Sequence, residues 1–173
     1  MRKLFLSSLF LLLIISCQDD SSNDLRASKK QYEKNVASFK AKFIAGFAKE
    51  DLELQMSLFA DSLKWVSPSA GGDLLGYEDL KNAANAYHAN FDEITYTNDL
   101  YFGSPIYNSQ NDDLAKANSN YIRTSGVWNN LHTETGKRVQ LKWMAVMWFN
   151  KDGKIHRITD FMDVSSIPNQ ISN

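Results

Sequence analysis

The hydrophobic pattern of the chain begins with a helical repeat. From about Ala27, large apolar residues recur at intervals of four, three, four and four positions, which places them on one face of a helix. These positions are Tyr32, Val36, Phe39, Phe43 and Phe47. The first part of the chain after Ala27 is therefore predicted to be a helix that buries this face.

Two shorter helices are predicted next. Asp51 is a candidate N-cap for a short helix that carries Leu54 and Leu58. A third helix is predicted to open at residues 76–80. Its buried side is expected to carry Leu80, Ala84, Tyr87 and Phe91.

Strand patterns then take over. A short strand is predicted over 61–66, and further strands over 95–102, 117–131, 138–150 and 154–163. Turn residues at 135–137 and 150–154 indicate hairpins, and the polar segment 108–113 is expected to form a rim loop. Helices followed by a mostly antiparallel sheet define an α+β fold.

The predicted strand 138–150 is apolar on both faces over its second half. One face carries Val139, Leu141, Trp143, Ala145, Met147 and Phe149, and the other carries Gln140, Lys142, Met144, Val146 and Trp148. A strand of this kind is covered on both sides. The helices of the domain would cover one side. A second copy of the chain would cover the other in a homodimer through the sheet, unless a tail or loop does so.

The first residues look like a targeting segment. Arg2 and Lys3 precede an apolar run that ends at Ile15. This run is shorter than the roughly 20 residues that a membrane span needs. A short apolar run after positive charges is typical of a secretory signal peptide. The sequence Ile14-Ile15-Ser16-Cys17 resembles the lipobox of bacterial lipoproteins, in which the cysteine is lipidated. We expect residues 1–16 to be a lipoprotein signal peptide and 17–27 a polar tether; the alternative is an uncleaved anchor with a chance cysteine.

The same segment suggests a location in the cell. In enteric bacteria, an aspartate directly after the lipidated cysteine favours retention at the inner membrane. Here Gln18 follows Cys17, so we expect a lipid anchor at Cys17 in the outer membrane of the cell envelope. Whether the domain faces the periplasm or the cell surface stays open. The acidic run after Cys17 resembles a surface-export signal but equally suits a short linker.

Composition excludes several classes of function. The chain has 173 residues, enough for one domain, with 19 Lys and Arg against 20 Asp and Glu. Loss of Arg2 and Lys3 with the signal peptide leaves 17 basic and 20 acidic side chains, so no nucleic-acid partner is expected. Cys17 is the single cysteine. No metal-ligand spacing, glycine-rich phosphate loop or G-x-S-x-G elbow occurs, so we expect neither a metal nor a cofactor.

Several strings in order resemble a known family. Residues 47–51, 58–65 and 76–80 and the ending 149–155, followed by Phe161 and Asp163, resemble the SnoaL-like branch of the nuclear-transport-factor-2-like (NTF2-like) superfamily. The resemblance covers about residues 30–167, which sets the domain at 28–167 and leaves 168–173 as a C-terminal tail. It implies a cystatin-like cone, in which three N-terminal helices pack into a strongly curved, mostly antiparallel sheet around a pocket. That fold hosts isomerases, cyclases and dehydratases as well as binding modules.

The resemblance also implies which residues face the pocket. The expected ligand-binding residues are Trp65, Tyr87, His88, Trp128, Met144 and Trp148. For the three on the sheet, Trp128, Met144 and Trp148, the alternative is that the adjacent residues, whose side chains point to the other face of the strand, line the pocket. The sequence leaves the parity open, because both faces of the central strand are apolar. A small, largely apolar molecule is the expected partner. The alternative is that the aromatic cluster is part of the hydrophobic core and binds no ligand.

Two candidate catalytic groups stand out. Asp160 lies in the middle of the last predicted strand, and in an apolar cavity its raised pKa would suit proton abstraction beside a carbonyl. His88 or a tyrosine would be its partner in a cofactor-free isomerase, cyclase or dehydratase, which is the alternative to simple binding. Both residues could instead have a purely structural role. Asp160 would then form an ion pair with Arg157, Arg123 or Arg138, and His88 would form a hydrogen bond with a loop carbonyl.

Overall fold

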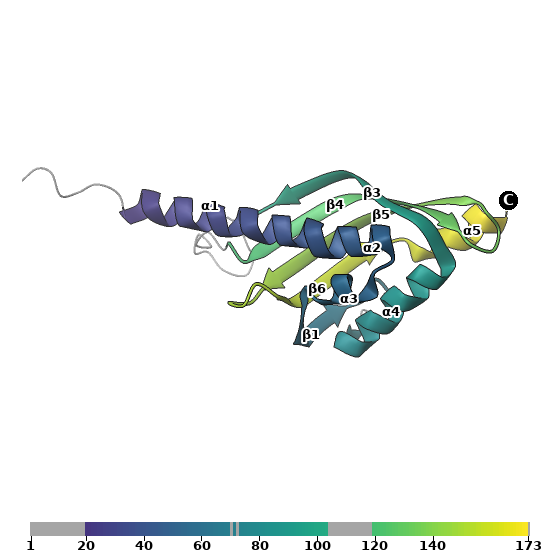
Figure 1. Cartoon of the computed structure of the whole chain (residues 1–173), viewed down its shortest axis with the longest axis horizontal. Coiled ribbons are helices and arrows are strands. Elements are labelled where there is room, and N and C mark those ends of the chain that lie inside the picture. Colours follow the sequence, from purple (N-terminus) through teal and green to yellow (C-terminus); the bar gives the residue numbers. More distant parts are fainter. Residues whose placement is uncertain (1–19, 70, 72, 104–118, 173) are drawn as a thin grey trace, which may run out of the picture.

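A long N-terminal helix crosses one side of the molecule (Figure 1). The computed structural model describes residues 20–69, 71, 73–103 and 119–172. Helix α1 (Asp20–Phe39), the π-helical turn η1 (Lys40–Ile44) and helix α2 (Ala45–Lys49) follow one another without a break in helical conformation. Phe39, Phe43 and Phe47 of the predicted apolar face are buried, and Tyr32 and Val36 pack against the core. The chain is already helical at Asp20, inside the segment 17–27 that the sequence assigns to a tether.

The second helix is shorter than its apolar spacing predicts. Helix α3 (Leu52–Met56) begins after Asp51, whose carboxylate accepts the Leu54 N–H at 2.9 Å, as the capping prediction requires. It ends at Met56, so Leu58 lies in the following turn, where it is fully buried. The sharp return between α2 and α3 runs through Glu50, which has a positive φ of 54°.

The third helix is confirmed. Helix α4 (Tyr77–Asn90) opens at Gly76, whose N–H is bound by the Asp79 carboxylate at 2.8 Å. Leu80 and Ala84 are buried as expected. Phe91, predicted on the same helix face, is instead the first residue of a strand.

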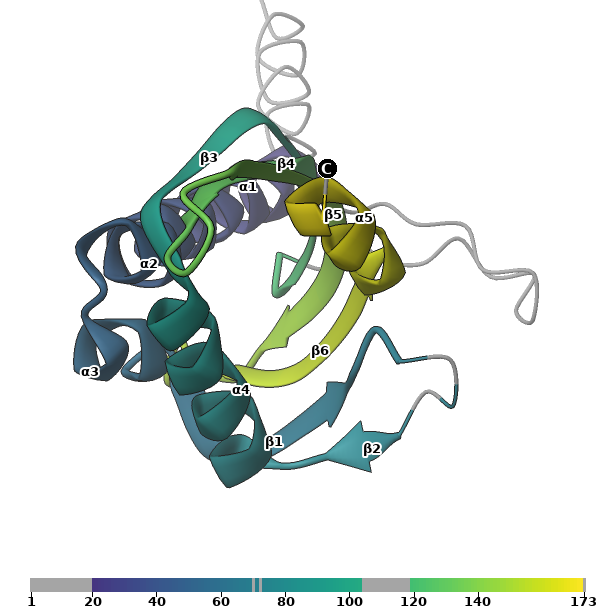
Figure 2. The ribbon, with the colours of Figure 1, turned by 90° about the vertical axis from the view of Figure 1, so that its right-hand side faces the viewer.

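The strands form one six-stranded mixed sheet. In chain order they are β1 (Phe59–Val66), β2 (Leu74–Leu75), β3 (Phe91–Phe102), β4 (Tyr121–His132), β5 (Arg138–Phe149) and β6 (Ile155–Met162). Their order across the sheet is β2-β1-β6-β5-β4-β3 (Figure 2). Only β1 and β6 run parallel; the other neighbours are antiparallel.

The expectation of a strongly curved cone is not met, since the sheet is not strongly curled. Bulges bend a strand and increase its local twist, and the register shifts between β1 and β6, between β3 and β4 and between β5 and β6. The long central pair β4–β5, however, keeps one unbroken register from Tyr121–Trp148 to Leu131–Arg138. The α+β architecture itself is confirmed, with helices packed on one face of the sheet.

The two faces of β5 are now distinguished. Val139, Leu141, Trp143, Ala145, Met147 and Phe149 are all buried beneath the helices. On the other face Met144 is 37% exposed, and Trp148 is half-buried against Tyr121 and Arg157. The sequence left this parity open.

The C-terminal segment is also folded. A short turn, η2 (Val164–Ser166), leads into helix α5 (Ile167–Ser172), most of which lies in the expected tail. The Gln170 side chain binds the backbone N–H and C=O of Gln140 on β5, which fixes the helix beside that strand.

Three sequence-based predictions concern parts of the chain outside the described residues: the signal peptide 1–16, the lipidated Cys17 and the rim loop 108–113. Within the described part, no helix is both long and apolar enough to cross a membrane.

Candidate functional site

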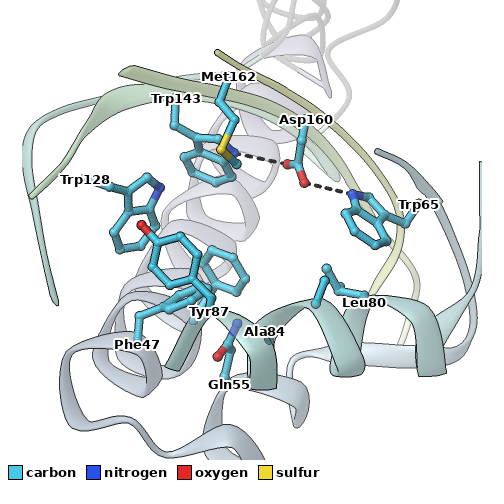
Figure 3. A pocket seen from close by; sticks show the side chains of 12 residues that line it. Phe47, Gln55, Trp65, Leu80, Ala84, Tyr87, Trp128, Trp143, Asp160 and Met162 are labelled. Atoms are coloured by element: carbon cyan, nitrogen blue, oxygen red, sulfur yellow. Dashed lines mark hydrogen bonds between the residues drawn. The ribbon is translucent and has the colours of Figure 1, made fainter. Parts of the chain in front are cut away.

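A small cavity of about 90 Å³ lies between the sheet and the helices (Figure 3). Strands β1, β4, β5 and β6 supply one side of it, and η1, α2, α3 and α4 the other. The lining residues are Phe43, Phe47, Gln55, Trp65, Leu80, Ala83, Ala84, Tyr87, Trp128, Trp143, Asp160 and Met162. The cavity is thus mainly aromatic, with few polar groups.

Strand pairing places Asp160 between two tryptophans. Strand β6 lies between β1 and β5, and the registers Trp65–Ile158 and Trp143–Met162 bring both indoles alongside Asp160. The Trp65 indole N–H donates to Oδ2 of Asp160 at 2.8 Å, and the Trp143 indole N–H donates to Oδ1 at 3.2 Å. Each carboxylate oxygen therefore has one neutral donor, which orients the carboxyl group rigidly.

Burial dominates the electrostatics of Asp160. The side chain is only 8% exposed, and this desolvation raises its pKa to about 7, although the two indole hydrogen bonds oppose the shift. No cation among the described residues compensates the charge. The three arginines considered as ion-pair partners lie elsewhere: Arg138 pairs with Glu93, Arg157 lies over Trp148, and Arg123 lies over Phe102. Asp160 is therefore a carboxyl group that changes its protonation near neutral pH.

Aromatic rings form the wall of the cavity. The ring centroid of Trp128 lies 4.9 Å from that of Phe47 and 5.8 Å from that of Trp143. Phe43 stacks against Trp143 at 5.9 Å. Such contacts hold the rings in fixed positions and favour apolar or flat ligand groups.

Gln55 is a polar group that the sequence analysis missed. It is fully buried on α3 and lines the cavity, yet neither its Oε1 nor its Nε2 has a hydrogen-bond partner among the described residues. An unpaired buried amide group costs about 1–3 kcal/mol. Gln55 is buried by the close contact between α2 and α3, where a Cβ at Gly46 would lie 2.7 Å from the Cβ of Gln55. Because this contact depends on how the two helices pack, no sequence pattern marks Gln55 as a cavity residue.

Tyr87 presents its ring to the cavity, while its hydroxyl is already engaged. The hydroxyl donates to Oδ1 of Asn130 at 2.9 Å, and burial raises the pKa of Tyr87. Asn130 is fully buried and also donates to the Val139 carbonyl at 3.3 Å. Tyr87 is thus a neutral wall residue whose proton is committed to Asn130.

The structure brings together four of the expected site residues, Trp65, Tyr87, Trp128 and Asp160. His88 lies beside Phe47, with ring centroids 5.3 Å apart, and outside the cavity lining; burial lowers its pKa. Met144 and Trp148 lie on the opposite face of the sheet, because they have the other parity on β5. Their opposite-parity neighbour Trp143 lines the cavity instead.

Metal ligands do not cluster in the part of the chain that the structure describes: no group of three or more His, Cys, Asp or Glu side chains there is arranged to hold an ion.

Helices packed on one face of a mixed six-stranded sheet, with a cavity between them, define an NTF2-like protein. The chain superposes on an NTF2-like protein from Burkholderia xenovorans with a TM-score of 0.55 and 13% identity, over 83% of this chain and 97% of that one. Residues 41–158 match the SnoaL-like domain, and the chain belongs to that family. Asp160 lies just beyond the matched residues.

Other similar structures carry names that suggest activities. A candidate isomerase from Bacillus subtilis has a TM-score of 0.62 and 16% identity, over 81% of this chain and 94% of that one. A candidate polyketide cyclase from a Silicibacter species has a TM-score of 0.62 and 14% identity, over 83% and 97%. At these identities the likeness shows the fold alone. A comparison with curated proteins finds no significant sequence match.

Proposed function

We propose that the domain binds a small, largely apolar molecule in the aromatic cavity and holds one polar atom of that molecule against Asp160. The observation that carries the proposal is the setting of this carboxyl group. It is buried in a cavity lined by aromatic rings, and its partners among the described residues are two indole N–H donors. Protonated, it donates a hydrogen bond to a ligand oxygen; ionised, it accepts one.

The size of the cavity limits the ligand. Pockets for drug-sized molecules measure roughly 300–1,000 Å³, whereas this one measures about 90 Å³. It therefore suits a compact molecule, or the compact end of a longer one that extends out of the site.

A pair of substitutions on one helix tests this proposal. Ala84 is buried and lines the cavity, whereas Ala86 on the same helix is exposed. Cyclohexanone, a compact apolar ring with one carbonyl, serves as the probe, and tryptophan fluorescence reports its binding. Ala84→Leu is expected to weaken binding at least about tenfold, and Ala86→Leu to leave it unchanged. The proposal fails if the wild type does not bind the probe, or if the two variants bind it equally well.

A second candidate function is proton transfer on the bound molecule. The observation that favours it is the pKa of Asp160, about 7, which suits a general base at neutral pH. The carboxylate would take a proton from a carbon that lies between a carbonyl and a carbon–carbon double bond, and return it to the far carbon of that double bond. The double bond moves next to the carbonyl, which is a net isomerisation. The names of the similar isomerase and cyclase structures agree with this chemistry. Among the described residues that line the cavity, Asp160 is the only carboxyl group and would act as the base. Tyr87 would not serve as the acid, because its hydroxyl donates to Asn130.

Deuterium exchange separates catalysis from binding. In deuterated buffer the wild type is expected to speed the entry of deuterium beside the carbonyl of cyclohexanone, and Asp160→Asn is expected to lose that acceleration while still binding the ring. Equal exchange rates for the two proteins would leave binding as the function.

We also propose that a lipid on Cys17 anchors the domain to the bacterial envelope, at the outer membrane. The lipobox-like sequence before Cys17 supports this, and multiple acyl chains give stable anchoring. Metabolic labelling with an alkyne fatty acid in a bacterial host is expected to label the wild type and to leave Cys17→Ser unlabelled. Equal labelling of both would contradict the proposal.

A homodimer through the outer face of the sheet remains our proposal for the oligomeric state. Met144 and Phe161 are paired across β5 and β6, and they are 37% and 49% exposed on this face. A second copy would cover them. Ultracentrifugation at micromolar concentration is expected to show a dimer that Phe161→Lys dissociates; a wild-type monomer would overturn this proposal.

A further inference from the structure

Gln55 is a buried amide that the fold leaves without partners. Its side chain is 0% exposed and lines the cavity, and both Oε1 and Nε2 lack hydrogen bonds within the described residues. The cavity around it is lined mainly by aromatic and aliphatic side chains. A leucine or methionine would suit such surroundings better, because unpaired polar groups are rare in protein interiors.

The backbone that carries Gln55 is held firmly. The Gln55 N–H donates to the Asp51 carbonyl at 3.0 Å, and Asp51 caps the helix. Gly46 of α2 lies so close that an added Cβ would be 2.8 Å from the Gln55 nitrogen and 2.9 Å from its Cα. The position of the amide at the cavity wall is therefore built into the contact between α2 and α3.

Neighbouring polar groups of the cavity are already engaged. The Tyr87 hydroxyl donates to Asn130, and both oxygens of Asp160 accept indole N–H groups. Figure 3 shows Gln55 on the side of the helices and Asp160 on the side of the sheet. None of these groups pairs with the amide of Gln55.

We infer that Gln55 is a second recognition group of this site, and that the ligand carries a hydrogen-bond donor next to an acceptor on the side that faces α3. This inference rests on the proposed ligand-binding function. A primary amide offers an N–H donor and a carbonyl acceptor in one plane. A lactam, a carboxamide or a protonated carboxylic acid pairs with both, whereas a ketone pairs with the N–H alone.

Two rings of equal size test the inference: 2-piperidone, which has an N–H beside its carbonyl, and cyclohexanone, which has the carbonyl only. Their dissociation constants are measured by NMR for the wild type and for Gln55→Leu, and the side-chain NH₂ signal of Gln55 is followed in the wild type. The preference for 2-piperidone over cyclohexanone is expected to fall about tenfold in the variant, and the Gln55 signal to shift with 2-piperidone.

The outcomes separate the two proposals. If both proteins bind cyclohexanone and show the same preference, the role of Gln55 is overturned and the binding function stands. If the wild type binds neither ring, the proposed function is overturned, and this inference falls with it.

A stability measurement gives an independent readout. Asn130 is a second fully buried amide, and it has partners in Tyr87 and Val139. Without ligand, Gln55→Leu is expected to melt at or above the temperature of the wild type, and Asn130→Leu several degrees below it. If Gln55→Leu melts as far below the wild type as Asn130→Leu does, the Gln55 amide is satisfied within the free protein, for instance by bound water, and the inference is overturned.

Discussion

The two faces of the β5–β6 pair differ in what they bury. On the inner face, Trp143 and Asp160 are 4% and 8% exposed and hydrogen-bonded to each other. On the outer face, the next residues along each strand, Met144 and Phe161, are paired and partly exposed. Neighbouring positions on the same strand therefore belong either to a rigid site with a titratable group or to a partly exposed apolar surface. Large apolar residues occur on both faces, but only the inner face encloses a buried carboxyl group.

The largest expected effect is a loss of stability on the inner face, seen by comparing two neighbouring residues of β5. Trp143→Ala removes a ring that packs against Phe39, Phe43 and Trp128, so the free energy of unfolding is expected to fall by about 3–5 kcal/mol. Met144→Ala is expected to lower it by less than about 1 kcal/mol, because the side chain is partly exposed. Urea denaturation of both variants checks this. Equal losses would mean that the outer face is as well packed as the inner one.

The next largest effect is the dependence of folding stability on pH. Because the pKa of Asp160 is raised from 3.8 to about 7, the folded protein binds this proton more tightly than the unfolded chain does. Its contribution to stability is therefore fully present below pH 3.8 and is lost as the pH rises to about 7. The amount is about 4 kcal/mol.

Other carboxyl groups also titrate in this range, so Asp160→Asn serves as the reference. The stability of the wild type relative to Asp160→Asn is expected to fall between pH 4 and pH 7 and to stay level above that. A relative stability that rises over the same interval would contradict the raised pKa.

A smaller effect tests the indole donors. Trp65→Phe keeps most of the ring and removes the N–H that binds Oδ2 of Asp160 at 2.8 Å. Since this donor favours the ionised form, its loss is expected to raise the pKa of Asp160 by roughly one unit. Trp148→Phe, on the outer face, is the control and is expected to leave that pKa unchanged. NMR titration of the carboxyl carbon measures both.

The smallest effect lies on the outer face. The Arg157 guanidinium lies 5.0 Å from the centre of the Trp148 ring. At such partly exposed sites a cation–π contact contributes about 0.5–1 kcal/mol, so Arg157→Gln is expected to cost no more than that in thermal denaturation. A loss as large as that of Trp143→Ala would remove the distinction between the faces.

The sequence predicts the helices and strands well, because each depends on local periodicity. The apolar face from Tyr32 to Phe47, the Asp51 cap and the 150–154 turn are all found. The π-turn at 40–44 and the helix α5 have no comparable local signal. The parity of β5 was open because apolar side chains occupy both faces, and only the packing of Trp143 under Phe39 decides it.

The site is less predictable, because its contacts join distant parts of the chain. The place of Asp160 in the middle of a strand marks it as a candidate, but its donors Trp65 and Trp143 depend on the strand order β1-β6-β5. No local pattern marks Gln55, because its burial comes from the close approach of Gly46. The family resemblance predicts His88 as a pocket residue, but it lies outside the cavity lining.

The central claim is that Asp160 is a buried carboxyl group that changes its protonation near neutral pH within an aromatic cavity. The most direct test is an NMR titration of its carboxyl carbon in the wild type, with Asp160→Asn used to assign the signal. A midpoint near pH 7 is expected. A midpoint close to 3.8, the ordinary value for an aspartate, would show that Asp160 is a solvated carboxylate and not a buried group that titrates near neutral pH.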